Sequence, residues 1–184
     1  MKLWLVRHAP AAVAAGLCYG RSDVPADEAA TRTLARDLAG QLSAGLRIRS
    51  SPLARCRHLA DTIAAFQPGL RVTVDERLRE MDFGRWELQP WDAIGVAELR
   101  AWTDDFAAHR PGGGESVQTL LDRVACALED TRRAQEDTLW VTHAGVIRAV
   151  KVLLAGVRVI EAAAQWPAEP IPFGTLQVHE LGPN

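Results

Sequence analysis

Short apolar runs and longer amphipathic stretches alternate along this chain. Residues 3–6 are consecutive apolar residues, and a run of this length suits a buried strand better than a helix. Leu34, Leu38 and Leu42 instead recur at helical spacing, which predicts a helix over about 27–44. The same patterns predict the remaining elements: strands at 46–48, 69–74, 138–142 and 175–179, the last near a sheet edge, and helices at 52–65, 97–108, 115–134 and 145–154.

The start of the second helix carries a signal of its own. Ser51 directly precedes Pro52, and a serine cap followed by proline at the first helical position is a sound helix start. We therefore expect Ser51 to be the N-cap of this helix.

Strands that alternate with helices predict an α/β fold with a largely parallel sheet. The chain has 184 residues, which is the size of one typical domain, so a single domain over 1–184 is expected. The hydrophobic fraction of 48% and the charged fraction of 24% are those of an ordinary globular protein.

Charge, hydropathy and cysteine usage exclude several classes of protein. The 21 Lys and Arg residues nearly balance the 23 Asp and Glu residues, which argues against a strongly basic nucleic-acid binder. The chain contains no run of 18 apolar residues, so we expect no membrane partner. The three cysteines are widely spaced and form no CxxC motif, which disfavours a disulfide framework or zinc ribbon and favours the reducing cytoplasm. Either a monomer or a homodimer is compatible with this sequence.

Cationic groups follow three of the predicted strands. Arg7 and His8 follow the first, Arg55 comes shortly after the second, and His143 follows the fourth. In open α/β sheets ligands bind beyond the carboxyl ends of the strands, so these side chains are expected to converge on one site. Their many donors suit a phosphate group, toward which the helix that starts near Ala144 could direct its amide groups. Taken singly, each of these residues could equally be an ordinary polar residue at a strand end or on a helix.

Five motifs in a fixed order narrow these alternatives. The motifs are Leu-Val-Arg7-His8-Ala9, Ser51-Pro52-Leu53-Ala54-Arg55-Cys56, Leu78-Arg79-Glu80-Met81-Asp82-Phe83-Gly84-Arg85-Trp86-Glu87, Gly113-Gly114-Glu115-Ser116 and Val141-Thr142-His143-Ala144-Gly145-Val146-Ile147-Arg148. Together they resemble the histidine phosphatase superfamily, also called phosphoglycerate-mutase-like, over about residues 2–150.

The resemblance implies a three-layer α/β/α sandwich and a role for each matching residue. His8 matches the nucleophile that becomes phosphohistidine, and Arg7 and Arg55 match the arginines that bind phosphate. His143 matches the second histidine of the pocket, and Glu80 matches the proton donor. This chemistry needs no metal and no cofactor, since the arginines and His143 take the place of a cation.

The chain departs from the family pattern after its first histidine. Ala9 stands where the family usually has glycine, and residues 11–15 lack the asparagine or threonine that touches phosphate in many members. We therefore expect the pocket to rely more on Arg21 or Ser22 for substrate binding. Tyr19, Trp86 and Trp91 are candidates for the pocket rim.

The resemblance implies a phosphomonoester hydrolase that acts on a small phosphorylated metabolite. The stretch 17–23 resembles α-ribazole phosphatases, which makes α-ribazole 5′-phosphate the leading substrate; a phosphoglycerate-mutase-like enzyme or a broad sugar-phosphate phosphatase is the alternative. Two readings from other classes remain, a phospholigand-binding protein without catalysis and a metal-dependent hydrolase that uses His8, His143 and Glu80 as ligands. A protein that only binds a phospholigand does not need a nucleophile and an acid, so the full set of residues argues against the first reading. The second reading is disfavoured because it places two arginines beside a divalent cation.

Overall fold

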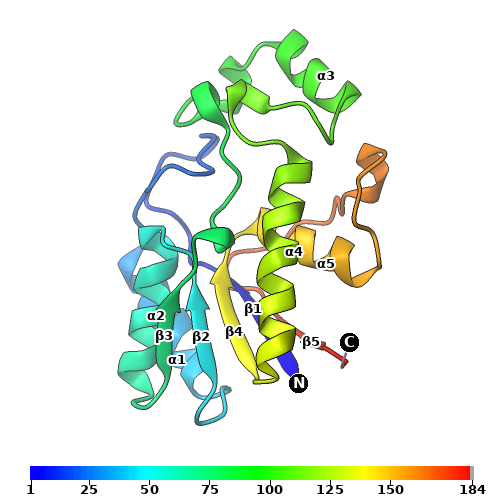
Figure 1. The fold of residues 1–184 in the computed structure, drawn as a ribbon. Helices are drawn as coiled ribbons and strands as arrows, with labels where there is room; N and C mark the ends of the chain where they lie inside the picture. Colours follow the sequence, from blue (N-terminus) through cyan, green and yellow to red (C-terminus); the bar gives the residue numbers. More distant parts are fainter. Residues whose placement is uncertain (183–184) are drawn as a thin grey trace.

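Five strands form one sheet in the order β3-β2-β4-β1-β5 (Figure 1). The computed structural model describes residues 1–182. β1 pairs in parallel with β4, β4 with β2, and β2 with β3, whereas β5 runs antiparallel to β1 at the edge. The strands are β1 (Lys2–Arg7), β2 (Arg47–Ser50), β3 (Arg71–Val74), β4 (Thr138–Thr142) and β5 (Leu176–Glu180), and the helices are α1 (Glu28–Ala39), α2 (Ala54–Phe66), α3 (Val96–Asp104), α4 (Val117–Ala134) and α5 (Ala144–Leu154).

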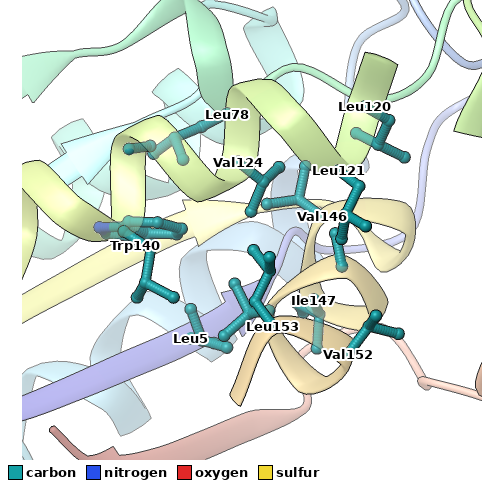
Figure 2. Packing of buried hydrophobic residues seen from close by; sticks show 14 of the residues in the cluster. Leu5, Leu78, Leu120, Leu121, Val124, Trp140, Val146, Ile147, Val152 and Leu153 are labelled. Carbon is teal, nitrogen blue, oxygen red and sulfur yellow. The ribbon is translucent and has the colours of Figure 1, made fainter. Parts of the chain in front are cut away.

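Helices cover both faces of this sheet, as Figure 1 shows. In β1, Leu3 and Leu5 pack into the cluster formed with α4 and α5, while Val6 packs into the cluster formed with α1 and α2. β4 alternates in the same way, because Trp140 joins the first cluster and its two apolar neighbours join the second. Figure 2 shows Leu5 and Trp140 beneath the side chains of α4 and α5. The expected three-layer α/β/α sandwich is therefore confirmed.

Two helices are shorter than the sequence predicts. α1 ends at Ala39 rather than near 44, because Gly40 caps it and its amide returns to the carbonyl of Arg36. Leu42 still packs in the core, so the apolar pattern correctly predicted its burial although it lies beyond the end of the helix. α3 ends at Asp104, short of residue 108.

The expected cap of α2 is wrong. This helix begins at Ala54, and the Ser51 amide, directly after β2, still donates to the carbonyl of Val141 in β4. The cap comes from a distant segment, because the Asp23 carboxylate accepts a hydrogen bond from the Ala54 amide at 2.6 Å.

The strand order brings three carboxyl ends side by side. β4 lies between β1 and β2, so the residues that follow these strands meet at one edge of the sheet. The His8 amide donates to the carbonyl of Thr142 at 3.1 Å, which ties the end of β1 to the end of β4. No helix within residues 1–182 is long and apolar enough to span a membrane.

Candidate active site

His8 lies directly after β1 and is 2% exposed. Its Nδ1 lies 2.6 Å from the carbonyl oxygen of Ala9. Because a carbonyl only accepts, Nδ1 carries the proton, and the lone pair of the neutral ring is at Nε2. Arg55 donates its Nε–H to that Nε2 at 3.2 Å. The local backbone thus fixes the tautomer that a nitrogen nucleophile requires.

Burial and nearby cations keep this ring neutral. Burial, followed by the charges of Arg55 and Arg7, lowers the pKa of His8 to about 3. His8 is therefore unprotonated at neutral pH, and Nε2 keeps its lone pair, which accepts the Arg55 donor in this structure.

Arg55 is a completely buried guanidinium in the first turn of α2. Its Nη1 donates to the carbonyl of Ser22 at 2.8 Å, and its Nη2 donates to the carbonyl of Gly20 at 2.7 Å. The sequence predicts that Arg55 lies near His8, and the structure places the two in direct contact. The sequence did not predict the carbonyl acceptors, since they come from a loop about 33 residues earlier.

Arg7 is held by the segment that precedes β5. Its Nη1 donates to the carbonyl of Ile171, and its guanidinium carbon lies 3.8 Å from the centroid of the Phe173 ring. The same ring lies 5.5 Å from the His8 ring, so Phe173 touches both residues. Sequence reasoning missed Phe173, because no motif surrounds it.

Glu80 faces the same site from the loop after β3. One carboxylate oxygen accepts from the amide of Met81 at 3.1 Å, and the other accepts from the amide of Gly145, in the first turn of α5, at 3.1 Å. The positive end of the helix dipole favours a carboxylate there. Gly145 makes this approach possible, because a Cβ at that position would lie 2.2 Å from Glu80 Oε1.

A further arginine, Arg123 of α4, supports the Glu80 loop. It donates to the carbonyls of Arg77, Arg79 and Glu80 at 2.6, 2.8 and 3.3 Å. Its remaining donors form a two-point ion pair with Glu115 at 2.7 and 2.8 Å. The Gly-Gly-Glu-Ser motif contains Glu115, but only the fold reveals that it anchors the loop of the candidate acid through Arg123.

His143 lies behind His8 rather than on the wall of its cavity. The two ring centroids are 5.1 Å apart, and His143 is fully buried, with its Nε2 at 2.8 Å from the hydroxyl of Ser51. Burial, with the charge of Arg55, lowers the pKa of His143 well below its usual value. Direct phosphate binding by His143 or by the Ala144 amide stays a prediction.

A cavity of about 330 Å³ opens in front of His8. Four of its lining residues are the candidate catalytic groups Arg7, His8, Arg55 and Glu80. The rest form an apolar and aromatic rim, namely Gly16, Leu17, Tyr19, Phe83 and Trp91. Trp86 is instead buried in a small core with Cys18 and Ile94, so only Tyr19 and Trp91 of the expected rim residues line the cavity.

Arg21 and Ser22 do not line this cavity. The Arg21 side chain is 60% exposed and pairs with Asp82 at 3.0 Å, beside a neighbouring cavity of about 530 Å³ that also reaches Glu80. Ser22 donates from its hydroxyl to Glu87 at 2.6 Å. Substrate binding by Arg21 or Ser22 therefore stays a prediction.

Ala9 is accommodated without strain. Among residues 1–182 the non-glycine residues with positive φ are Leu88 and Gln135, so Ala9 needs no glycine-like backbone. Its side chain is fully buried. Within the same residues, no three His, Cys, Asp or Glu side chains gather closely enough to hold a metal ion.

Comparison with known proteins gives one family and several similar structures. The model of the histidine phosphatase superfamily (branch 1) matches residues 3–168. The Hydrogenobacter thermophilus protein named "Putative phosphoserine phosphatase 2" is 33% identical over 165 residues, which are 85% of this chain and 79% of that protein. The Thermus thermophilus protein TTHB049 superposes with a TM-score of 0.74 at 29% identity and covers 100% of this chain and 95% of its own. A mycobacterial glucosyl-3-phosphoglycerate phosphatase superposes with a TM-score of 0.73 at 26% identity, over 85% and 80% of the two chains.

Proposed function

The chain belongs to the histidine phosphatase superfamily (branch 1), and from this premise we propose that it hydrolyses phosphomonoesters through a phosphohistidine formed on His8. The observation that carries the proposal is the buried, neutral His8, whose Nε2 lone pair meets the Arg55 guanidinium at 3.2 Å. A protein that only bound phosphate would gain nothing from holding a histidine neutral between two arginines. The relatives named as phosphatases support hydrolysis in general.

In the first step, His8 Nε2 attacks phosphorus. A phosphorus–nitrogen bond forms, the bond to the ester oxygen breaks, and protonated Glu80 gives its proton to the departing alkoxide. Arg7 and Arg55 hold the phosphoryl oxygens, whose charge they stabilise as the bond to the leaving group lengthens. Each Glu80 oxygen retains a lone pair beyond the one that its backbone donor occupies, so the carboxyl can exchange a proton in place.

In the second step, ionised Glu80 removes a proton from water. The water oxygen attacks phosphorus, the phosphorus–nitrogen bond breaks, and the electron pair returns to His8 Nε2. Inorganic phosphate leaves, and Glu80 is protonated again for the next cycle. Every proton and electron pair is thus carried by this chain, the substrate and water, without a metal ion or cofactor.

The proposed substrate is a small phosphomonoester, with α-ribazole 5′-phosphate as its leading candidate. The rim residues Tyr19, Phe83 and Trp91 offer ring faces on which an aromatic base could stack. Sugar phosphates and phosphoglycerates are the alternative, since relatives carry names of that kind.

A pre-steady-state assay tests the reaction. With a nitrophenyl phosphate and EDTA present, we expect a burst of nitrophenol that equals the enzyme concentration whenever dephosphorylation is slower than phosphorylation, and no burst from His8→Ala. Full loss of turnover on EDTA treatment would overturn the metal-independent mechanism. A panel containing α-ribazole 5′-phosphate, sugar phosphates and phosphoglycerates then ranks kcat/KM, and the ribazole assignment fails if that ester ranks among the poor substrates.

A further inference from the structure

Glu87 binds four hydrogen-bond donors outside the catalytic cavity. Its Oε1 accepts from the amides of Arg21 at 2.8 Å and Phe83 at 3.0 Å. Its Oε2 accepts from the amide of Ser22 at 3.0 Å and from the Ser22 hydroxyl at 2.6 Å. Three of these donors belong to the end of one loop, residues 16–22, which we call the cavity loop because Gly16, Leu17 and Tyr19 line the His8 cavity.

The cavity loop packs along the segment that carries Glu87. Backbone pairs join Cys18 to Leu88 and Gln89 at 2.6 and 2.8 Å, and they join Gly16 to Trp91 at 2.9 Å. Gly20 allows the close approach at the other end, since a Cβ there would lie 1.9 Å from the carbonyl oxygen of Met81. The exposed ion pair of Arg21 adds little, because solvent screens such pairs. Glu87 is therefore the side chain that fixes the end of the cavity loop.

That end of the loop holds the guanidinium of Arg55. The acceptors of its two terminal nitrogens are the carbonyls of Gly20 and Ser22, and Ser22 is bound twice by Glu87. The third contact of the same guanidinium is the one to His8 Nε2. A continuous series of hydrogen bonds thus leads from Glu87 through the loop backbone to Arg55 and the lone pair of the nucleophile.

We propose that Glu87 is a positioning residue, which clamps the cavity loop so that Arg55 meets His8 Nε2 and the phosphoryl group. The expected effect of Glu87 on catalysis rests on the proposed function. Its expected effect on the affinity for inorganic phosphate does not. A carboxylate suits this position because all four partners are donors. A glutamine would offer one accepting oxygen and would turn its own N–H groups toward the remaining donors.

A double-mutant cycle with Arg55 tests this proposal. We expect Glu87→Gln to lower the phosphorylation rate of His8 and the affinity for inorganic phosphate at least tenfold in the wild-type background. In the Arg55→Lys background, where the side chain can no longer bridge both carbonyls, the same change should cost less than twofold. Equal losses in the two backgrounds would overturn the proposal, because Glu87 would then act independently of Arg55.

Two further variants separate positioning from folding. Ser22→Ala removes only one of the four contacts and should show the same non-additivity with a smaller loss, even if Glu87→Gln folds poorly. Glu98→Gln is the matched control, because Glu98 pairs with Arg85 at 3.0 Å and with Trp86 and, among residues 1–182, forms no hydrogen bond or ion pair with the cavity loop. Its phosphate affinity and rate should stay within twofold of wild type, and a loss as large as that of Glu87→Gln would count against a specific clamp.

The pKa of His8 provides an independent measurement. His8 is faced by Arg7 from β1, Arg55 from α2, His143 at the start of α5, and Glu80 and Tyr19 across the cavity. Release of Arg55 removes one cation, so an NMR titration should place the pKa of His8 higher in Glu87→Gln than in wild type. An unchanged pKa would contradict the clamp. The wild-type protein could hydrolyse no phosphomonoester while its phosphate affinity still showed the expected non-additivity between Glu87→Gln and Arg55→Lys. The proposed function would then fail and the clamp would stand.

Discussion

Gly145→Ala separates the position of Glu80 from the stability of the fold. Gly145 lies in the first turn of α5, where its amide donates to Glu80 at 3.1 Å. An added Cβ would lie 2.2 Å from Glu80 Oε1 and 3.2 Å from its carboxyl carbon, whereas the nearest atom of Leu120 lies at 3.5 Å. The overlap is thus confined to the Glu80 carboxylate, which must move by about 1 Å to restore ordinary van der Waals contact.

The two expected effects have different sizes. Alanine raises helix stability by about 1 kcal/mol relative to glycine, and displacement of Glu80 removes hydrogen bonds worth about 1 kcal/mol each. The free energy of unfolding should therefore change by no more than about 1 kcal/mol. A displacement of about 1 Å in a catalytic group can reduce the rate about 100-fold, so kcat for an alkyl phosphate should fall by that order.

The leaving group identifies the cause of the loss. Nitrophenolate departs with little protonation, so the variant should lose less than about fivefold in the rate of the nitrophenol burst, which reports the phosphorylation step alone. Gly95→Ala is the control, because an added Cβ at that position meets nothing within 4 Å and should leave both rates unchanged. Urea unfolding measures stability beside the kinetics. Equal losses in the phosphorylation rates of both substrates would refute the assignment of Glu80 as the proton donor, because the later hydrolysis step is common to both.

Three further predictions follow from individual contacts. The unfolded chain protonates His8 near pH 6.5 and the folded chain only near pH 3. The free energy of unfolding should therefore fall as pH drops through this window, and His8 should contribute up to about 1.4 kcal/mol per pH unit to the decline. In urea unfolding, His8→Asn should make this decline less steep. Asp23→Ala should cost about 1 kcal/mol of stability by removing the cap on Ala54, and no loss would exclude that cap. Phe173→Leu should weaken inorganic phosphate binding about threefold in calorimetry, because Arg7 loses its stacked ring; unchanged affinity would contradict this.

Sequence patterns predicted the sheet well because its strands are locally encoded. The run 3–6 and the stretch 138–142 both form central strands, since their apolar side chains fill a core on each face. The amphipathic stretch 115–134 likewise gives α4 within two residues at its start and at the same residue at its end. A long-range contact accounts for the wrong cap of α2, because Asp23 accepts from the Ala54 amide from 31 residues away and no local signal reveals it.

The same distinction applies to the candidate site. Arg7, His8, Arg55 and Glu80 were predicted from strand ends and ordered motifs, and the structure brings all four to one cavity. Glu87 was visible in a motif, but its role depends on a loop more than 60 residues earlier in the chain. Phe173 lies beyond the residues that the family model matches, and only the antiparallel return of β5 places it against Arg7. Residues that position a reacting group through tertiary contacts are thus the part that a single sequence does not reveal.

Direct location of the phosphoryl group tests the central claim. A radiolabelled phosphomonoester is mixed with the enzyme, and the reaction is quenched with alkali within the first turnover and digested for mass spectrometry. We predict a base-stable, acid-labile phosphoryl group on Nε2 of His8, which is absent from His8→Ala. The account would be contradicted by a label on a residue other than His8. It would also be contradicted by turnover without any covalent label under conditions that trap a nitrophenol burst.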